Sequence, residues 1–242
     1  MDMNEYNEYR QSSVYANDKF QYETLSNYTA KTFLWMFAGL MVTFGVALAA
    51  YLSNAAWYLF QSNIMFIGLA VVEVVLVMVL ASRIHKMSVG SARALFFLYA
   101  AVNGIVFSSY LWLFDLGDVL MAFASASLYF GAMAAYGYMT KRDLTNWRTP
   151  LLFGLISLLV VSVVGIFFMN GTSLLFSVLG IVVFSCYTAY DTQKIKSAYF
   201  AFAGNQEMAQ KASIFAALQL YLDFINLFLY LLRIFARSNS DN

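Results

Sequence analysis

Long apolar stretches separated by short polar segments dominate the pattern of this chain. Seven of these stretches are long enough for a membrane-spanning helix, which needs about 20 predominantly apolar residues. Their apolar residues run continuously instead of alternating, so the pattern predicts helices and an all-α, polytopic membrane protein. The expected spans are Thr32–Leu52, Ile64–Ser82, Ala92–Phe114, Val119–Met139, Leu151–Met169, Ser173–Tyr190 and Ala212–Phe235.

The two ends of the sequence are polar. Met1–Ser26 is rich in Asn, Tyr, Gln, Ser and acidic residues and lacks the apolar core of a cleavable signal peptide. We expect it to be a disordered cytoplasmic tail. Residues 27–237 then form one seven-helix transmembrane domain, and residues 238–242 a second short tail.

Composition excludes most other classes of protein. Hydrophobic residues make up 62% of the chain and charged residues 11%, whereas soluble domains have about 25% charged residues. The net charge of +1 gives no reason to expect nucleic acid. Cys186 and His85 are single residues of their kinds, and the common hydrolase and P-loop signatures are absent. We therefore expect no enzymatic activity and no resident cofactor.

Lysine and arginine are distributed unevenly among the connections. The connections Ser53–Ser62, Asp115–Asp118 and Asn170–Thr172 contain neither residue. The positive-inside rule then puts the amino terminus in the cytoplasm and, after seven full crossings of the inner membrane, the carboxyl terminus outside. A last segment that dips in and returns would instead keep Arg233 and Arg237 inside. The other basic residues, all on the cytoplasmic side, are Arg10, Lys19, Lys31, Arg83, Lys86, Arg93, Lys141, Arg142, Arg148, Lys194, Lys196 and Lys211.

Small residues recur every four positions in two of the spans. Such spacing lets helix backbones approach each other closely. We therefore expect both sets to lie in helix contacts. They are Gly39, Thr43 and Ala47 in the first span and Ser127, Gly131 and Ala135 in the fourth.

Three carboxylates fall within or beside the apolar spans. Glu73 lies midway along the second span, Asp191 follows the sixth and Asp223 is in the middle of the seventh. Because a charge inside the hydrocarbon is costly, such residues are candidates for a functional site. Asp191 also has a simpler interpretation as an interfacial residue beside Lys194.

The seventh span carries polar residues on one face. Consecutive members of this set are four, three, four and three residues apart, so they form one stripe along a helix. The other faces are Leu, Ile and Phe, which predicts a central helix that lines or plugs a polar pathway. The members of the stripe are Gln219, Asp223, Asn226, Tyr230 and Arg233.

Two stretches carry a family signature. Phe184–Lys196 has the sequence FSCYTAYDTQKIK, and Leu220–Arg233 has the sequence LYLDFINLFLYLLR. Both resemble the closing motifs of the Bax inhibitor family, most closely its bacterial branch. The resemblance covers residues 30–237, including the loop Thr140–Leu144, and implies a central seventh helix surrounded by six others.

The resemblance also implies a function. Members of this family are linked to pH-sensitive calcium leak across a membrane, and the eukaryotic members to suppression of cell death. Aspartates matching Asp191 and Asp223 form a hydrogen-bonded pH sensor, and residues matching Glu73 and Arg83 are implicated near the pore. Bacterial members are also discussed as modulators of membrane proteolysis, which makes a membrane protease a candidate partner.

Residues and resemblance together suggest a calcium leak gated by protons. Calcium prefers oxygen ligands, and Asp191, Asp223 and Glu73 can supply them transiently. The expected pore or gate residues are Glu73, Arg83, Gln219, Asn226, Tyr230 and Arg233. A non-conducting regulator of a membrane protein and a proton-coupled transporter are the alternatives.

The sequence alone does not pair the two aspartates. Asp191 lies three residues from Lys194, whereas Asp223 lies twelve residues from Lys211. At about 1.5 Å per residue, the two carboxyls would lie at different depths. Tilted helices, or a seventh helix that begins in the cytoplasm, would close the gap.

Overall fold

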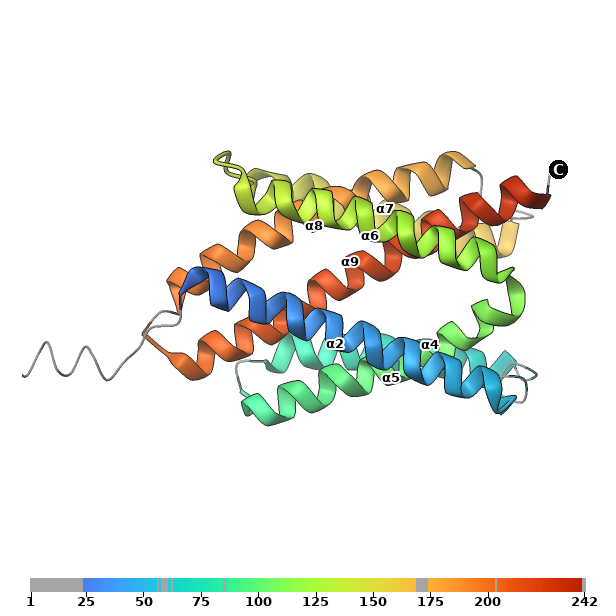
Figure 1. The fold of residues 1–242 in the computed structure, drawn as a ribbon, viewed down its shortest axis with the longest axis horizontal. Coiled ribbons are helices and arrows are strands. Elements are labelled where there is room, and N and C mark those ends of the chain that lie inside the picture. The colour runs from blue at the N-terminus through green and yellow to red at the C-terminus, as the bar shows by residue number, and fades with distance from the viewer. Residues whose placement is uncertain are drawn as a thin grey trace, which may run out of the picture.

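The computed structural model describes residues 24–55, 57, 61, 63–84, 86–168, 174–202 and 204–240. Within them the protein is a bundle of helices that lie beside one another along the length of the molecule (Figure 1). Most of the polar tail, His85 and the connection at 170–172 lie outside this part of the chain. The described elements are α2 (Leu25–Leu52), α4 (Asn63–Arg83), α5 (Val89–Leu113), α6 (Leu116–Met139), the 3₁₀ turn η1 (Thr145–Trp147), α7 (Arg148–Phe168), α8 (Leu174–Ala201) and α9 (Gln206–Ser240).

The all-helical class is confirmed for the described residues. Five helices, α2, α5, α6, α8 and α9, are long and apolar enough to cross a membrane. The remaining two, α4 and α7, have 21 residues each. The protein therefore has several candidate spans, as a multi-pass membrane protein requires.

Several helices extend past the predicted apolar spans. Helix α8 continues to Ala201, and α9 runs from Gln206 to Ser240, through part of the predicted second tail. Helix α2 begins at Leu25, where Thr24 accepts a hydrogen bond from the amide of Asn27 at 3.2 Å. The added turns contain polar residues. A helix can contain such residues where it extends beyond the hydrocarbon, but a search for apolar stretches stops before them.

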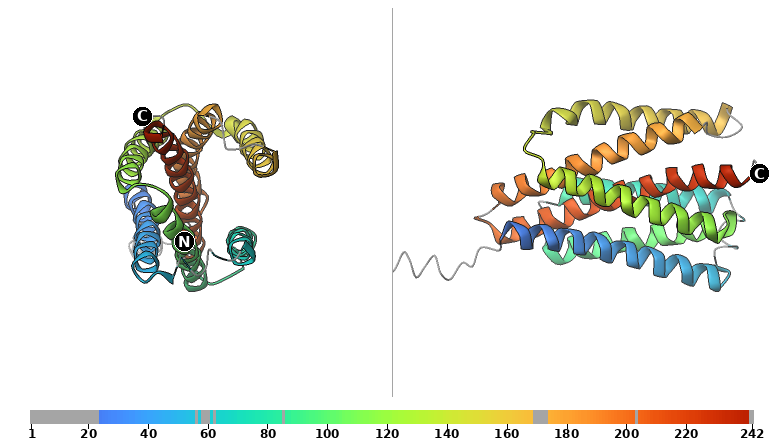
Figure 2. Two further views of the ribbon diagram at one scale, coloured as in Figure 1. Left: turned by 90° about the vertical axis from the view of Figure 1, so that its right-hand side faces the viewer. Right: turned by 45° about the horizontal axis from the view of Figure 1, so that its top comes forward.

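Helix α9 is the central element of the bundle. It packs against α8, α6, α2 and α5, and 67% of the residues in its most apolar stretch are buried inside the protein. Helix α4 packs mainly against α5 and α7 mainly against α8, so both lie at the outside of the bundle (Figure 2). This arrangement agrees with the prediction of a central last helix.

One of the two predicted small-residue contacts is confirmed. Gly39, Thr43 and Ala47 are buried, and a Cβ at Gly104 of α5 would lie 2.6 Å from the Thr43 carbonyl oxygen. Helices α2 and α5 therefore meet with their backbones close together.

The second predicted contact is wrong. Ser127, Gly131 and Ala135 are exposed, and a Cβ at Gly131 would meet nothing within 4 Å. The buried side of α6 is an adjacent face that also carries small residues, because the whole helix is apolar and its sequence does not mark which side meets protein. The buried residues of α6 are Asp118, Ala122, Ala126, Phe130, Ala134 and Gly137.

The connections between helices lie at the two opposite ends of the bundle. The connections α4–α5, α6–α7 and α8–α9 lie at the same end as the start of α2, and the carboxyl terminus lies at the other (Figure 1). These three connections and the turns beside them contain nine of the fourteen Lys and Arg residues. Helix α9 is one continuous helix of 35 residues, about 53 Å long. It therefore traverses the bundle instead of dipping in and returning.

Candidate functional site

Asp191 and Asp223 come together where α8 crosses α9. Both residues are buried, each with 4% of its surface exposed. Gln219 donates a long hydrogen bond of 3.5 Å to Asp191 Oδ1. Since Gln219 lies one turn before Asp223, the carboxyls are staggered by about a turn of α9. The packing of α8 against α9 therefore brings to neighbouring turns two residues that the count from the flanking lysines placed at different depths.

The site contains polar atoms that the surrounding protein does not satisfy. Asp223 Oδ2 and Thr192 Oγ1 are buried without a hydrogen-bond partner among the described residues. Leaving a buried polar group unpaired costs about 1–3 kcal/mol. Lys194 Nζ lies 3.8 Å from Asp191 Oδ1 but is itself 46% exposed, so it compensates only part of the site. These unpaired polar groups identify the contact between α8 and α9 as a candidate functional site.

Two cavities lie along α9 on either side of Asp223. One, of about 180 Å³, lies between α4, α8 and α9 at the basic end and has Gln219 in its wall. The other, of about 210 Å³, lies between α7, α8 and α9, with Asn226, Tyr230 and Arg233 in its wall. The predicted stripe therefore lines both cavities, and Asp223 lies in the buried stretch that separates them.

The part of the stripe farther from the basic end is held by aromatic contacts. The Tyr230 ring stacks on Phe184, with 5.9 Å between centroids, and the Arg233 guanidinium carbon lies 5.4 Å from the Tyr230 ring centre. Asn226 donates a hydrogen bond of 2.8 Å to the carbonyl oxygen of Leu222 within α9. These contacts fix one wall of the second cavity, and the Arg233 side chain reaches the exposed rim.

Glu73 and Arg83 lie apart from the aspartates. Glu73 Oε1 is buried without a partner among the described residues, on α4, which packs mainly against α5. Arg83 is exposed at the end of α4. Among the described residues, no three His, Cys, Asp or Glu side chains gather as metal ligands. Glu73 therefore does not join the two aspartates in one ligand set.

Comparison with known sequences settles the family. The profile described as "Inhibitor of apoptosis-promoting Bax1" matches residues 25–240, from the start of α2 to the end of α9. The chain belongs to this Bax inhibitor family. Every helix described above thus lies within the matched residues.

Several relatives of this Bax inhibitor family protein are bacterial. Inner membrane protein YbhL of Escherichia coli K12 is 40% identical over 220 residues, covering 87% of this chain and 92% of the relative. An uncharacterized protein of Borreliella burgdorferi is 34% identical over 218 residues (89% and 94%). Protein RP147 of Rickettsia prowazekii is 40% identical over 219 residues (87% and 89%). The inner-membrane relative and the apolar helices support a multi-pass inner-membrane protein.

Buried hydroxyl groups that link α2 to α9 were not predicted. Thr43 Oγ1 lies 2.6 Å from the Tyr221 hydroxyl, and Thr32 Oγ1 lies 2.8 Å from Ser213 Oγ. In this Bax inhibitor family protein they fix α9 against α2. A hydroxyl in an apolar helix can simply bond to the preceding turn, so its sequence position does not reveal a partner on another helix.

The Thr140–Leu144 loop of the family resemblance holds α8 in place. Gln193 donates to the Arg142 carbonyl oxygen and accepts from the Leu144 amide, both at 2.8 Å. Asp143, in the same loop, accepts hydrogen bonds from the side chain and backbone of Thr145, which hold the pKa of Asp143 below its ordinary value. Because Gln193 is two residues from Asp191, the loop helps to position that carboxyl.

Proposed function

We propose that this protein is a proton-gated leak pathway for calcium across the inner membrane. The observation that carries the proposal is the position of Asp223, buried beside Asp191 between the two cavities that flank it along α9. In this proposal the chain crosses the membrane seven times, and its basic connections face the cytoplasm.

The gate follows from the chemistry of two neighbouring carboxyls. In a site of low dielectric both cannot be ionised at low cost, so one of the two carboxyls holds a proton in the closed state. Loss of that proton adds a second negative charge and pushes Asp191 and Asp223 apart. Lys194, at 3.8 Å, then draws Asp191 toward the cytoplasmic cavity. Helix α9 shifts against α8, and the barrier between the cavities opens.

The ion would use the same polar atoms as the proton. Calcium is a hard cation with oxygen ligands, and the separated carboxylates supply them transiently, so calcium and protons compete. Asn226 and Tyr230 add polar atoms on the far side. Arg233 at the outer rim repels cations and keeps passage slow, as expected of a leak.

The test is calcium flux into liposomes that contain the purified protein. Asp191→Asn and Asp223→Asn keep the shape of a protonated aspartate but cannot ionise. We expect each to abolish most of the pH dependence between about pH 6 and 8, and the double variant to add little because the pair acts as a unit. Asp115→Asn, at an exposed residue before α6 whose side chain makes no capping hydrogen bond, is the matched control and should keep the parent profile.

Three outcomes would contradict the proposal. Unaltered pH profiles in both aspartate variants would remove the pair as the sensor. Absence of flux through folded parent protein would favour a non-conducting regulator, and a strict requirement for an imposed proton gradient would favour a transporter.

A further inference from the structure

The cavity at the basic end of the bundle has a charge pattern of its own. Two of its wall residues are lysines, Lys194 from α8 and Lys211 from α9, and none of its wall residues is acidic. Gln219 is the third polar residue of the wall. Most of the remaining surface is apolar, contributed by Ala81, Ile84, Ala198, Phe202, Met208, Ala212, Phe215 and Ala216.

Lys211 is a buried cation with an exposed partner. Its side chain is 6% exposed, and its Nζ lies 2.7 Å from Glu207 Oε1, whose side chain is 63% exposed. An ammonium group has three donors, so this bond leaves donor capacity for another acceptor. Because Glu207 is well solvated, it can turn into water at small cost when a stronger anion enters the cavity.

Lys194 offers a second cation from the facing helix. Its ion pair with Asp191 is long, at 3.8 Å, and its Nζ lies 5.2 Å from the Tyr190 ring centre. Neither contact holds the ammonium tightly. Two ammonium groups on α8 and α9 can therefore converge on one anion between them.

The depth of the cavity fits the boundary between lipid headgroups and acyl chains. Helix α9 begins at Gln206, so Lys211 is about 8 Å along it. Helix α4 packs mainly against α5 and stands at an outer corner of the bundle (Figure 2), which leaves its contact with α8 and α9 loose. Ile84, Phe202 and Phe215 supply walls suited to an acyl chain.

We propose that this cavity binds the phosphate headgroup of an anionic phospholipid, with Lys211 and Lys194 as its ligands. Basic pockets between membrane helices on the cytoplasmic side are suited to anionic headgroups. A free phosphate ion shares the charge chemistry but has no use for the apolar walls, so the lipid is favoured. This cavity is also the cytoplasmic end of the proposed ion pathway, but lipid binding is measured without measuring flux, so the two proposals can fail separately.

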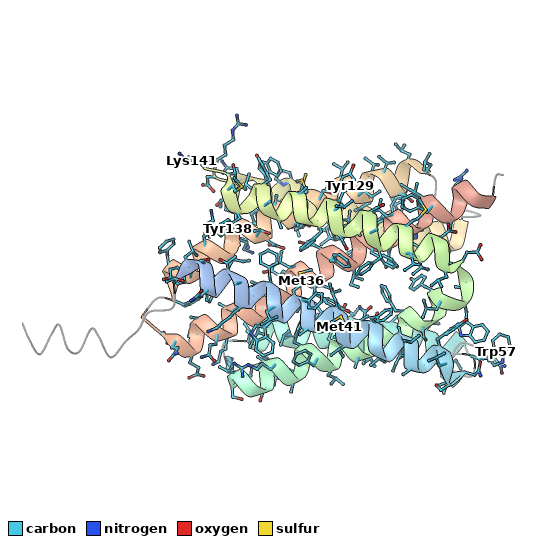
Figure 3. All side chains as sticks on the ribbon, viewed as in Figure 1. Met36, Met41, Trp57, Tyr129, Tyr138 and Lys141 are labelled. Carbon is cyan, nitrogen blue, oxygen red and sulfur yellow. The ribbon has the colours of Figure 1, made fainter. Side chains whose placement is uncertain are left out.

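The experiment counts lipids bound to the full-length protein in detergent by native mass spectrometry. Phosphatidylglycerol is titrated against phosphatidylcholine of the same acyl chains. We expect a phosphatidylglycerol-selective site whose affinity falls about fivefold or more in Lys211→Gln and in Lys194→Gln. Lys141→Gln is the matched control: this residue extends from the end of the bundle (Figure 3), and its loss should leave the selective site intact.

Further measurements keep the proposal falsifiable. Thermal unfolding of each variant shows whether the fold is retained, and Lys194→Gln, which alters a half-exposed residue, serves where Lys211→Gln does not fold. Equal binding of the two lipids, or equal losses in Lys141→Gln, would overturn the proposal. Displacement of phosphatidylglycerol by millimolar inorganic phosphate would overturn the lipid assignment in favour of a site for the free anion.

Discussion

Asn103, which is buried, and Asn226, which is partly buried, act differently in this protein. Asn103 Nδ2 donates to the Tyr99 hydroxyl at 3.0 Å, within α5. Asn226 bonds to its own helix at Leu222 and lines the cavity that also contains Arg233. The first residue satisfies a neighbour in the packed interior, whereas the second belongs to the stripe of α9.

The same substitution at the two sites separates these roles. Asn226→Leu should lower calcium flux about tenfold, the equivalent of ~1.4 kcal/mol in the barrier, because it replaces a polar wall with an apolar one. Asn103→Leu should cost stability by about 1 kcal/mol and leave flux per folded protein unchanged. Flux in liposomes, normalised to folded protein, is the measurement. Equal flux in the two variants would mean that the stripe does not line the pathway.

At the scale of elements, the contact between α6 and α8 helps to position the Asp191 carboxyl. A Cβ at Gly137 would collide with the carbonyl oxygen of Ala189, which lies two residues before Asp191. Gln193 ties the same stretch of α8 to the loop after α6. The position of Asp191 therefore depends on how closely α6 approaches.

Two glycines of α6 provide a matched pair for this contact. Gly137→Ala should destabilise the protein by about 1–3 kcal/mol, because the backbone of α8 must move away. Gly131→Ala meets open space and should be neutral or stabilising by up to about 1 kcal/mol from helix propensity alone. Thermal unfolding in detergent measures both changes. A Gly137→Ala protein as stable as the parent would refute the close contact.

At the scale of the whole molecule, the basic connections gather at one end of the bundle and α9 ends at the other (Figure 1). Clustered Lys and Arg residues stay on the cytoplasmic side during insertion. A continuous α9 then carries the carboxyl terminus to the opposite side. From the arrangement of the helices and the charge bias we therefore predict one orientation, with the amino terminus inside and the carboxyl terminus outside.

Cysteine labelling in intact cells tests this orientation. In a Cys186→Ser background, cysteines at Ser53 and Ser240 should react with a membrane-impermeant maleimide added outside. A cysteine at Ser88 should react only after the cells are opened. Labelling of position 88 from outside would reverse the orientation, and protection of position 240 would show that α9 does not cross.

The sequence by itself determined the membrane class, the central last helix with its polar stripe, and the clustering of most Lys and Arg residues in alternate connections. Each of these depends on the chemistry of residues along one segment. Tertiary structure alone decided which face of α6 meets α8, that Gln219 reaches Asp191 beside Asp223, that Glu73 lies apart, and that Lys211 is buried against a cavity. The physical reason is that spans apolar on every side can face lipid or protein equally well, so helix rotation and tilt are set by the neighbouring helices.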